Sequence, residues 1–155
     1  MKSTIAVDVS AEIARPRSEV WSFLLLEPER MPDYLGEFES ARLESGSPGE
    51  VGSVIRFTVS PGHRSGTLEL VKVEPERSFA WDGPPMRWMG GAARPRGSFE
   101  LADVREGSTL LTWRFRPELS GTQVLLGPYL KRWLRRQRLA DVQKLKQLLE
   151  AEAPG

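Results

Sequence analysis

PYLKRWLRRQRLADVQKLKQLLEAE, residues 128–152, is the stretch that decides the fold. Gly127 and Pro128 mark its beginning, because a proline in the first turn of a helix needs no amide partner. No glycine or second proline follows within it, so we expect a single helix. At about 1.5 Å per residue this helix would be roughly 37 Å long, enough to lie across most of a small domain.

The expected helix is amphipathic at about 100° per residue, and its apolar face is interrupted. That face carries Leu126, Leu130, Trp133, Leu134, Leu145 and Leu148, with Val142 and Leu149 at its edge. The opposite face carries Arg132, Arg135, Arg136 and Lys146. Gln137 and Asp141 lie at the centre of the apolar face, where a helix packed on an ordinary core would have Leu or Ile. We therefore expect these two side chains to point toward the rest of the domain and to meet a polar void or a ligand.

The composition is that of one ordinary globular domain, and we assign residues 1–155 to it. The 22 basic and 21 acidic side chains give a net charge of +1, so no global field would recruit nucleic acid or an anionic membrane. Residues 1–10 alternate polar and apolar side chains as a strand does, and no apolar run is long enough to span a membrane. We therefore expect a cytoplasmic protein without membrane insertion.

Residue counts and motifs exclude several kinds of site. The sequence has no cysteine, which removes disulfides, thiolate catalysis and cysteine-based metal sites. The one histidine, His63, lies in a stretch of turn composition, so we expect it to be exposed and not to bind a metal. No glycine-rich nucleotide motif, phosphate loop or zinc-binding helix motif is present, and we expect no cofactor.

Ahead of the long helix, the sequence alternates as strands do and is divided by turn residues. We expect a first strand at Thr4–Ile13, then two short helices at Glu19–Leu26 and Glu29–Gly36. Six further strands follow at Phe38–Ser45, Gly52–Ser60, Ser65–Glu74, Arg77–Gly83, Arg96–Val104 and Ser108–Arg116. Their short spacings favour antiparallel hairpins, since a parallel crossover needs a dozen or more residues. Residues 151–155 are expected to form a frayed tail.

The inward positions of these strands are rich in aromatic residues. Alternation places on one face Ile55, Phe57, Val59, Phe79, Trp81, Phe99, Leu101, Leu111, Trp113 and Phe115. This pattern predicts an α+β fold in which a curved seven-stranded antiparallel sheet wraps the long helix. Bulky rings on a curved sheet favour a cavity between sheet and helix, and the alternative is that the aromatic side chains simply form the core.

Three stretches are similar to those of a known family. They are IARPRSEVW at 13–21 followed by MPDYL at 31–35, VEPERSFAW at 73–81, and GSTLLTW at 107–113. Together with the long helix, they resemble the polyketide cyclase/dehydrase branch of the START-like superfamily, which is also called SRPBCC or Bet v 1-like. The resemblance covers nearly the whole chain and implies the helix-grip fold, with an internal cavity that the C-terminal helix closes and that holds small, mostly apolar molecules.

The resemblance is specific for the fold and does not choose the chemistry. Members of the family include aromatase/cyclases, dehydratases, lipid and quinone carriers, hormone receptors and a co-chaperone domain. The family has no invariant catalytic motif, so the resemblance assigns no catalytic residue to this chain.

The candidate ligand-binding residues combine the aromatic face, the apolar helix face and its two polar interruptions. They are Tyr34, Phe57, Trp81, Trp88, Phe99, Trp113, Phe115, Leu130, Trp133, Leu134, Gln137 and Asp141. Asp141 is also the candidate catalytic residue, because burial would raise the pKa of its carboxyl group and suit acid or base chemistry. The alternative is that Asp141 forms an ion pair with a neighbouring arginine such as Arg138.

Two further features are less specific. The segment Gly83–Arg96 holds Met86, Trp88 and Met89 between proline and glycine residues. We expect either a mobile loop beside the cavity mouth or a long hairpin packed on its rim. Five basic residues in the first half of the helix are expected to form a solvated face rather than a partner-binding patch. They are Lys131, Arg132, Arg135, Arg136 and Arg138.

Two classes of function are open on the sequence. The first is a protein that holds a small aromatic or polycyclic molecule in the cavity and promotes its cyclisation or dehydration. The second is a non-catalytic carrier of lipid or quinone, or an interaction module that uses the basic helix face. The identity of the ligand and the oligomeric state are left open.

Overall fold

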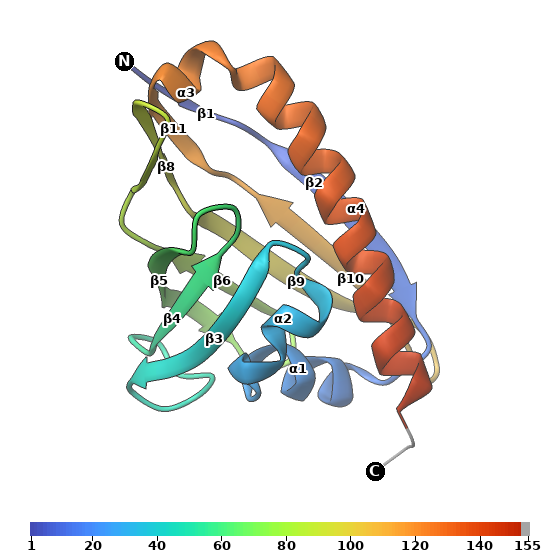
Figure 1. The fold of residues 1–155 in the computed structure, drawn as a ribbon. Coiled ribbons are helices and arrows are strands. Elements are labelled where there is room, and N and C mark those ends of the chain that lie inside the picture. The colour runs from blue at the N-terminus through green and yellow to red at the C-terminus, as the bar shows by residue number, and fades with distance from the viewer. Residues whose placement is uncertain (153–155) are drawn as a thin grey trace.

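Seven antiparallel strands form the main sheet of the computed structural model, which describes residues 1–152 (Figure 1). In spatial order they are β2 (Val7–Ile13), β10 (Ser108–Phe115), β9 (Arg96–Arg105), β6 (Ser78–Asp82), β5 (Arg64–Glu74), β4 (Val54–Val59) and β3 (Phe38–Ser45). Strands β3 to β6 are neighbours both in the chain and in the sheet, as short turns between antiparallel strands require. The predicted seven-stranded antiparallel sheet is confirmed.

An aromatic row crosses the centre of this sheet. Phe79, Phe99 and Trp113 lie opposite one another on β6, β9 and β10. The ring centroids of Phe99 and Trp113 are 4.8 Å apart, and those of Phe79 and Phe99 are 5.2 Å apart. Gly97 lies beside this row, where a Cβ atom would come within 2.6 Å of the Trp81 ring. Glycine at this position therefore lets the Trp81 ring cover β9.

A smaller sheet, which the sequence did not predict, lies at one end of the molecule. Its strands are, in order, β1 (Lys2–Thr4), β11 (Glu118–Gly121), β8 (Gly91–Arg94) and β7 (Met86–Trp88). The expected first strand Thr4–Ile13 is wrong at its start, because the chain joins the main sheet only at Val7 and pairs with β11 before that. Strands of three or four residues are too short to show an alternating pattern.

The segment Gly83–Arg96 contains a hairpin. β7 and β8 are joined by Met89 and Gly90, whose φ angles are both positive, at 52° and 77°. Two consecutive positive φ angles define the type I′ turn, which matches the twist of a two-residue hairpin. Of the two interpretations of this segment, the hairpin is the one observed.

The long helix α4 (Gly127–Ala151) runs along the length of the molecule (Figure 1). Helix α1 (Arg17–Leu25), the 3-10 helix η1 (Pro28–Arg30) and α2 (Met31–Tyr34) lie toward its C-terminal end, and α3 (Thr122–Leu125) precedes its start. The expected tail begins inside α4, and its residues 153–155 lie outside the described part of the chain. None of the helices within residues 1–152 has the length and apolar character needed to cross a membrane.

The buried face of α4 is rotated from the predicted one. Its buried residues are Leu134, Arg138, Asp141, Val142, Leu145 and Leu149. Leu126 and Trp133, which we expected on the buried face, are exposed. At about 100° per residue, the centres of the two faces differ by roughly 70°. The difference arises because a basic residue such as Arg138 predicts a solvent-facing position, whereas Arg138 lies within the buried stripe.

Candidate functional site

A cavity of about 610 Å³ lies between the main sheet and α4. Small-molecule sites occupy roughly 300–1,000 Å³, so the volume is of the right size for a ligand. The lining side chains are mostly apolar or aromatic, and ten of the twelve candidate ligand-binding residues are among them. These ten are Tyr34, Phe57, Trp81, Trp88, Phe99, Trp113, Phe115, Leu130, Trp133 and Leu134. The sequence left open whether the aromatic face borders a cavity or only forms the core, and the structure has the cavity.

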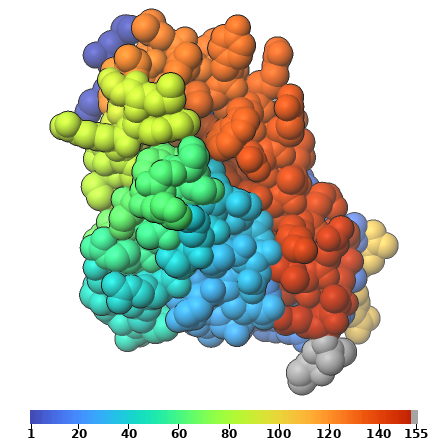
Figure 2. Space-filling model, in the orientation of Figure 1, coloured from blue at the N-terminus to red at the C-terminus, as the bar shows by residue number. Residues whose placement is uncertain are grey.

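The cavity lining reaches the surface between α4 and the β7–β8 hairpin. Trp88 and Met89 of the hairpin, together with Leu126 and Trp133, line the cavity and are also exposed. We call this opening the mouth and these four residues the mouth residues. The Gln123 side-chain amide donates a hydrogen bond to the carbonyl oxygen of Trp88 at 2.8 Å, which ties the hairpin to α3. Figure 2 shows the hairpin in yellow-green beside the start of α4 in orange.

Asp141 and Gln137 do not line the cavity, contrary to the prediction. Asp141 is only 3% exposed and faces the junction of α2 and β3. Its Oδ1 accepts a hydrogen bond from the Gly36 amide at 3.1 Å, and its Oδ2 accepts one from Arg138 Nη1 at 2.7 Å. Gln137 is half-buried and lies near the same glycine. The ion pair with Arg138, which was the alternative prediction, is therefore what holds Asp141.

This environment bears on the candidate catalytic role of Asp141. Burial raises the pKa of Asp141 above its ordinary value, and the charge of Arg138 and the Gly36 amide oppose this effect without cancelling it. Both carboxyl oxygens already accept hydrogen bonds, and the side chain does not line the cavity. Asp141 is therefore badly placed to exchange a proton with a ligand held there.

Arg138 is a buried charged side chain that lines the cavity. It is 4% exposed, and its guanidinium Cζ lies 5.0 Å from the ring centroid of Trp113 and 4.6 Å from that of Phe115. Its Nη1 donates to Asp141, and its Nη2 donates to a carboxylate oxygen of Glu37. Two carboxylates and two aromatic faces thus surround the cation, which is how a buried charge is normally compensated.

The prediction that Arg138 belongs to a solvated basic face is wrong. A signal for its burial was present in the sequence. Leu134, Arg138, Asp141 and Leu145 follow the spacing i, i+4, i+7, i+11, which is the period of one helical face. Arg138 and Asp141, which are oppositely charged and three positions apart in that row, could have indicated a buried ion pair.

The polar groups at the cavity wall mainly donate hydrogen bonds. Arg138 Nε and Trp113 Nε1 are buried and have no acceptor among residues 1–152. Burial, helped by the charge of Asp141, raises the pKa of the Tyr34 hydroxyl, so that group stays protonated near neutral pH. Glu37 also lines the cavity, but its carboxylate is bound to Arg138. Such a wall suits a ligand that presents an oxygen acceptor.

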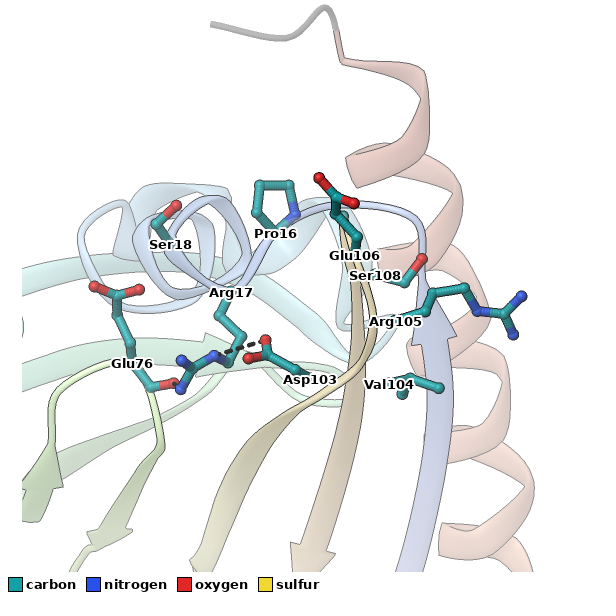
Figure 3. A pocket seen from close by; sticks show the side chains of 10 residues that line it. Pro16, Arg17, Ser18, Glu76, Asp103, Val104, Arg105, Glu106 and Ser108 are labelled. Carbon is teal, nitrogen blue, oxygen red and sulfur yellow. Dashed lines mark hydrogen bonds and ion pairs between the residues drawn. The ribbon is translucent and has the colours of Figure 1, made fainter.

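A second hollow of about 500 Å³ opens beside α1, at the far ends of the main-sheet strands (Figure 3). Arg17 and Asp103, two of its charged residues, are engaged with each other. Arg17 Nε donates to Asp103 at 2.8 Å, and Arg17 Nη1 donates to the carbonyl oxygen of Glu76 at 3.2 Å. Few apolar side chains line this hollow, so it offers little to a small hydrophobic molecule. No group of three or more His, Asp or Glu side chains within residues 1–152 is arranged to hold a metal ion.

Comparisons with known proteins agree with this geometry. The family described as polyketide cyclase/dehydrase and lipid transport matches residues 4–150. A START superfamily protein from Mycobacterium smegmatis has a similar structure, with a TM-score of 0.77 and 15% identity over 94% of this chain and 97% of that one. Among curated protein sequences, none matches this chain.

Two structurally similar proteins are enzymes by name. The Zhui aromatase/cyclase from Streptomyces sp. R1128 has a TM-score of 0.74 and 15% identity, covering 96% of this chain and 94% of that one. Norcoclaurine synthase from Thalictrum flavum, solved with dopamine and hydroxybenzaldehyde, has a TM-score of 0.67 and 17% identity, covering 99% and 91%. At these identities the structures share the helix-grip fold, which does not by itself carry over an activity.

Proposed function

We propose that this chain, which belongs to the polyketide cyclase/dehydrase and lipid transport family, binds a small hydrophobic molecule of aromatic or polycyclic type. The observation that carries the proposal is the cavity of about 610 Å³ between the main sheet and α4. The rings of Trp81, Phe99 and Trp113 give its wall flat apolar surface on which a planar molecule can stack. Each Å² of apolar ligand surface removed from water there contributes roughly 25 cal/mol.

The polar part of the wall favours a ligand that carries a neutral oxygen acceptor. Tyr34, Trp113 and Arg138 line the cavity and carry hydrogen-bond donors, so a ligand with a carbonyl or hydroxyl oxygen suits this wall better than one with a further donor. An anionic group is less favourable, because Glu37 and Asp141 already oppose the charge of Arg138. An aromatic ketone or a quinone has both the planar shape and the acceptor.

Binding of this ligand is better supported than its chemical conversion by the protein. Cyclisation or dehydration needs a group that can accept a proton close to the ligand. Asp141 does not line the cavity, and Glu37 is bound to Arg138. We therefore place a non-catalytic carrier first and a cyclase or dehydratase second.

Native mass spectrometry of the purified protein tests the binding directly. We expect a retained small molecule that excess anthraquinone, a planar aromatic diketone, displaces. Incubation with a linear poly-β-ketone then distinguishes a carrier from a cyclase. A cyclised product that forms only in the presence of the protein would move the cyclase to first place.

Ala93→Phe tests whether the cavity is where the ligand binds. Ala93 lies on β8 opposite Met86 and Leu119, which also line the cavity, whereas its neighbour Ala92 projects to the other side of the hairpin. A phenyl ring at position 93 should fill the cavity and weaken anthraquinone binding at least about tenfold, measured by quenching of tryptophan fluorescence. The matched variant Ala92→Phe should leave Kd within about twofold. Equal affinities in the two variants would place the ligand elsewhere and contradict the proposal.

A further inference from the structure

Exposed apolar side chains extend the mouth outward over the surface. Leu125 and Tyr129 are 77% and 78% exposed, and neither lines the cavity. Together with the mouth residues they gather at the tip of the β7–β8 hairpin and the start of α4. We call this cluster the apolar rim, and its members are Trp88, Met89, Leu125, Leu126, Tyr129 and Trp133. A gathering of large apolar side chains on one region of the surface indicates an interaction site.

The apolar rim is held together by hydrogen bonds through α3. The hydroxyl group of Thr122 donates to the carbonyl oxygen of Met89, and the Gln123 amide donates to that of Trp88. The hairpin tip is therefore fixed against the segment that carries Leu125. The exposure of these side chains is thus a property of a packed surface, and the hairpin and the start of α4 present it jointly.

The segments that form the apolar rim carry basic residues and no acidic ones. Residues 122–140 contain five basic and no acidic side chains, and residues 86–94 contain two basic and no acidic ones. Arg138 is buried against Glu37 and Asp141, and Arg94 is paired with Asp82, so the other five basic side chains carry the exposed charge. Arg132 follows Tyr129 by three positions, and Arg136 follows Trp133 by three, so each arginine stands next to one of these rings on the helix surface. Both arginines are exposed. Although the whole chain is nearly neutral, the surface around the rim is therefore locally positive.

The basic residues on the two sides of α4 are not equivalent. Tyr129, Arg132, Trp133 and Arg136 fall within a sector of roughly 100°. Lys131 and Arg135 fall outside this sector. The charge of Arg135 contributes to the lowered pKa of Asp8 on β2, after the larger effect of a hydrogen bond from Arg116 to Asp8, so Arg135 lies on the β2 side of the helix. Arg132 and Arg136 are therefore the two helix cations that share a side with the rim.

We propose that the apolar rim, with Arg132 and Arg136, docks this protein on the surface of an anionic phospholipid bilayer. Tryptophan and tyrosine rings suit the interface because they combine an apolar body with a polar edge, and arginine pairs with lipid phosphate groups. The apolar side chains would enter the headgroup region while the cations bind the charged surface. Docking in this way sets the cavity mouth against the lipid, so that a hydrophobic molecule can pass between cavity and bilayer without crossing water.

Co-sedimentation with vesicles tests the docking, and it needs no ligand in the cavity. We expect the full chain to bind vesicles made of equal parts phosphatidylglycerol and phosphatidylcholine, and to bind pure phosphatidylcholine at least about tenfold more weakly. Raising the salt concentration should reduce binding to the anionic vesicles, because salt screens exposed charges. Absence of binding to the anionic vesicles would overturn the proposal and leave the proposed ligand binding unaffected.

Two pairs of variants separate docking from unspecific attraction. Arg132→Glu with Arg136→Glu should lower the vesicle partition coefficient at least about tenfold, whereas Lys131→Glu with Arg135→Glu, which changes the net charge equally, should lower it by less than about threefold. An equal loss of vesicle binding in the two double variants would show that the net charge, and not the position of Arg132 and Arg136, determines binding. That result would overturn the proposal.

A second pair of double variants tests the contribution of the apolar side chains to vesicle binding. Leu125→Ser with Tyr129→Ser should weaken vesicle binding at least about fivefold, whereas Val51→Ser with Val104→Ser removes exposed apolar groups elsewhere and should have no effect. All four positions are exposed, so circular dichroism should show folded proteins in each case. Sedimentation equilibrium adds a last check. A stable dimer that the Leu125→Ser and Tyr129→Ser changes dissociate would mean that the rim binds a second copy of the chain, and would overturn the proposal.

Discussion

The two halves of α4 differ in how they are attached to the rest of the molecule. In the C-terminal half, residues 138–151, the side chains of Val142, Leu145 and Leu149 are almost completely buried, and the helix packs against β2. In the N-terminal half, residues 127–137, Leu134 alone is buried. The helix is thus part of the core at one end and the cover of a cavity at the other.

Polar contacts follow the same division. In the C-terminal half, Lys146 Nζ donates to the carbonyl oxygen of Glu12 at 2.6 Å and to Glu150 at 2.8 Å. Glu150 also accepts a hydrogen bond from the Ala14 amide at 2.8 Å. In the N-terminal half, Arg132 and Arg136 form no ion pair within residues 1–152. One continuous helix therefore has a fastened half that supplies stability and a half whose surface is available for binding, so changes in the two halves should have different consequences.

The largest effect is expected at Arg138, where the two halves meet. Arg138→Met would leave the carboxylates of Asp141 and Glu37 near the protein interior without their counter-charge. Removing one partner of a buried ion pair costs about 3–5 kcal/mol of unfolding free energy, which urea denaturation measures. The matched variant Arg135→Met, one turn earlier and exposed, should change it by less than about 0.5 kcal/mol. Similar stabilities for the two variants would show that the Arg138 network contributes nothing to the fold.

A smaller difference is expected between two leucines of the same helix. Leu145→Ala removes a fully buried side chain and should cost about 2–4 kcal/mol, because it opens a new void in the core. Leu130→Ala only enlarges a cavity that already exists, and it should cost less than about 1 kcal/mol. Thermal or urea denaturation of both variants measures the contrast. Comparable losses would mean that the N-terminal half is packed as tightly as the C-terminal half.

The sequence was sufficient for the parts of the molecule that show a long periodic pattern. The seven strands of the main sheet, the long helix and the aromatic row through Phe79, Phe99 and Trp113 were all predicted, because alternation and helical period report burial directly. Of the ten predicted residues that line the cavity, alternation led to Phe57, Trp81, Phe99, Trp113 and Phe115, and the helical period led to Leu130, Trp133 and Leu134. Strands of three or four residues gave no such pattern, so the smaller sheet was not predicted.

The polar contacts around Arg138 and Asp141 were harder to predict, because Glu37 and Gly36 come from a distant part of the chain. A helical projection gives the side of the helix on which a residue lies but not its tertiary partners, so it could not show that Glu37 and the Trp113 ring compensate a buried Arg138. It also assigned Asp141 to the cavity, although Gly36 and Arg138 bind that carboxylate. A tertiary partner decides whether a charge can be buried, and one sequence does not identify that partner.

The smallest effect concerns the pH dependence of the fastened half. The hydrogen bond from Lys146, followed by that from the Ala14 amide, lowers the pKa of Glu150 below its ordinary value. A carboxylate with a lowered folded-state pKa stabilises the fold above its unfolded pKa, about 4.3, and this stabilisation is lost as the pH falls through the folded-state pKa. Glu150→Gln should therefore cost about 0.5–1 kcal/mol near pH 7 and less at about pH 3. Urea denaturation at the two pH values measures the difference.

Glu106→Gln provides the control for this last prediction, because Glu106 is exposed in a turn and forms no ion pair within residues 1–152. Its effect on the unfolding free energy should be small and equal at both pH values. If the cost of Glu150→Gln persists at the lower pH, the contacts of Glu150 do not depend on its charge. The C-terminal half of α4 would then be fastened by the packing of Val142, Leu145 and Leu149 and by hydrogen bonds that do not depend on the charge of Glu150, and the electrostatic part of the contrast between the two halves would have to be given up.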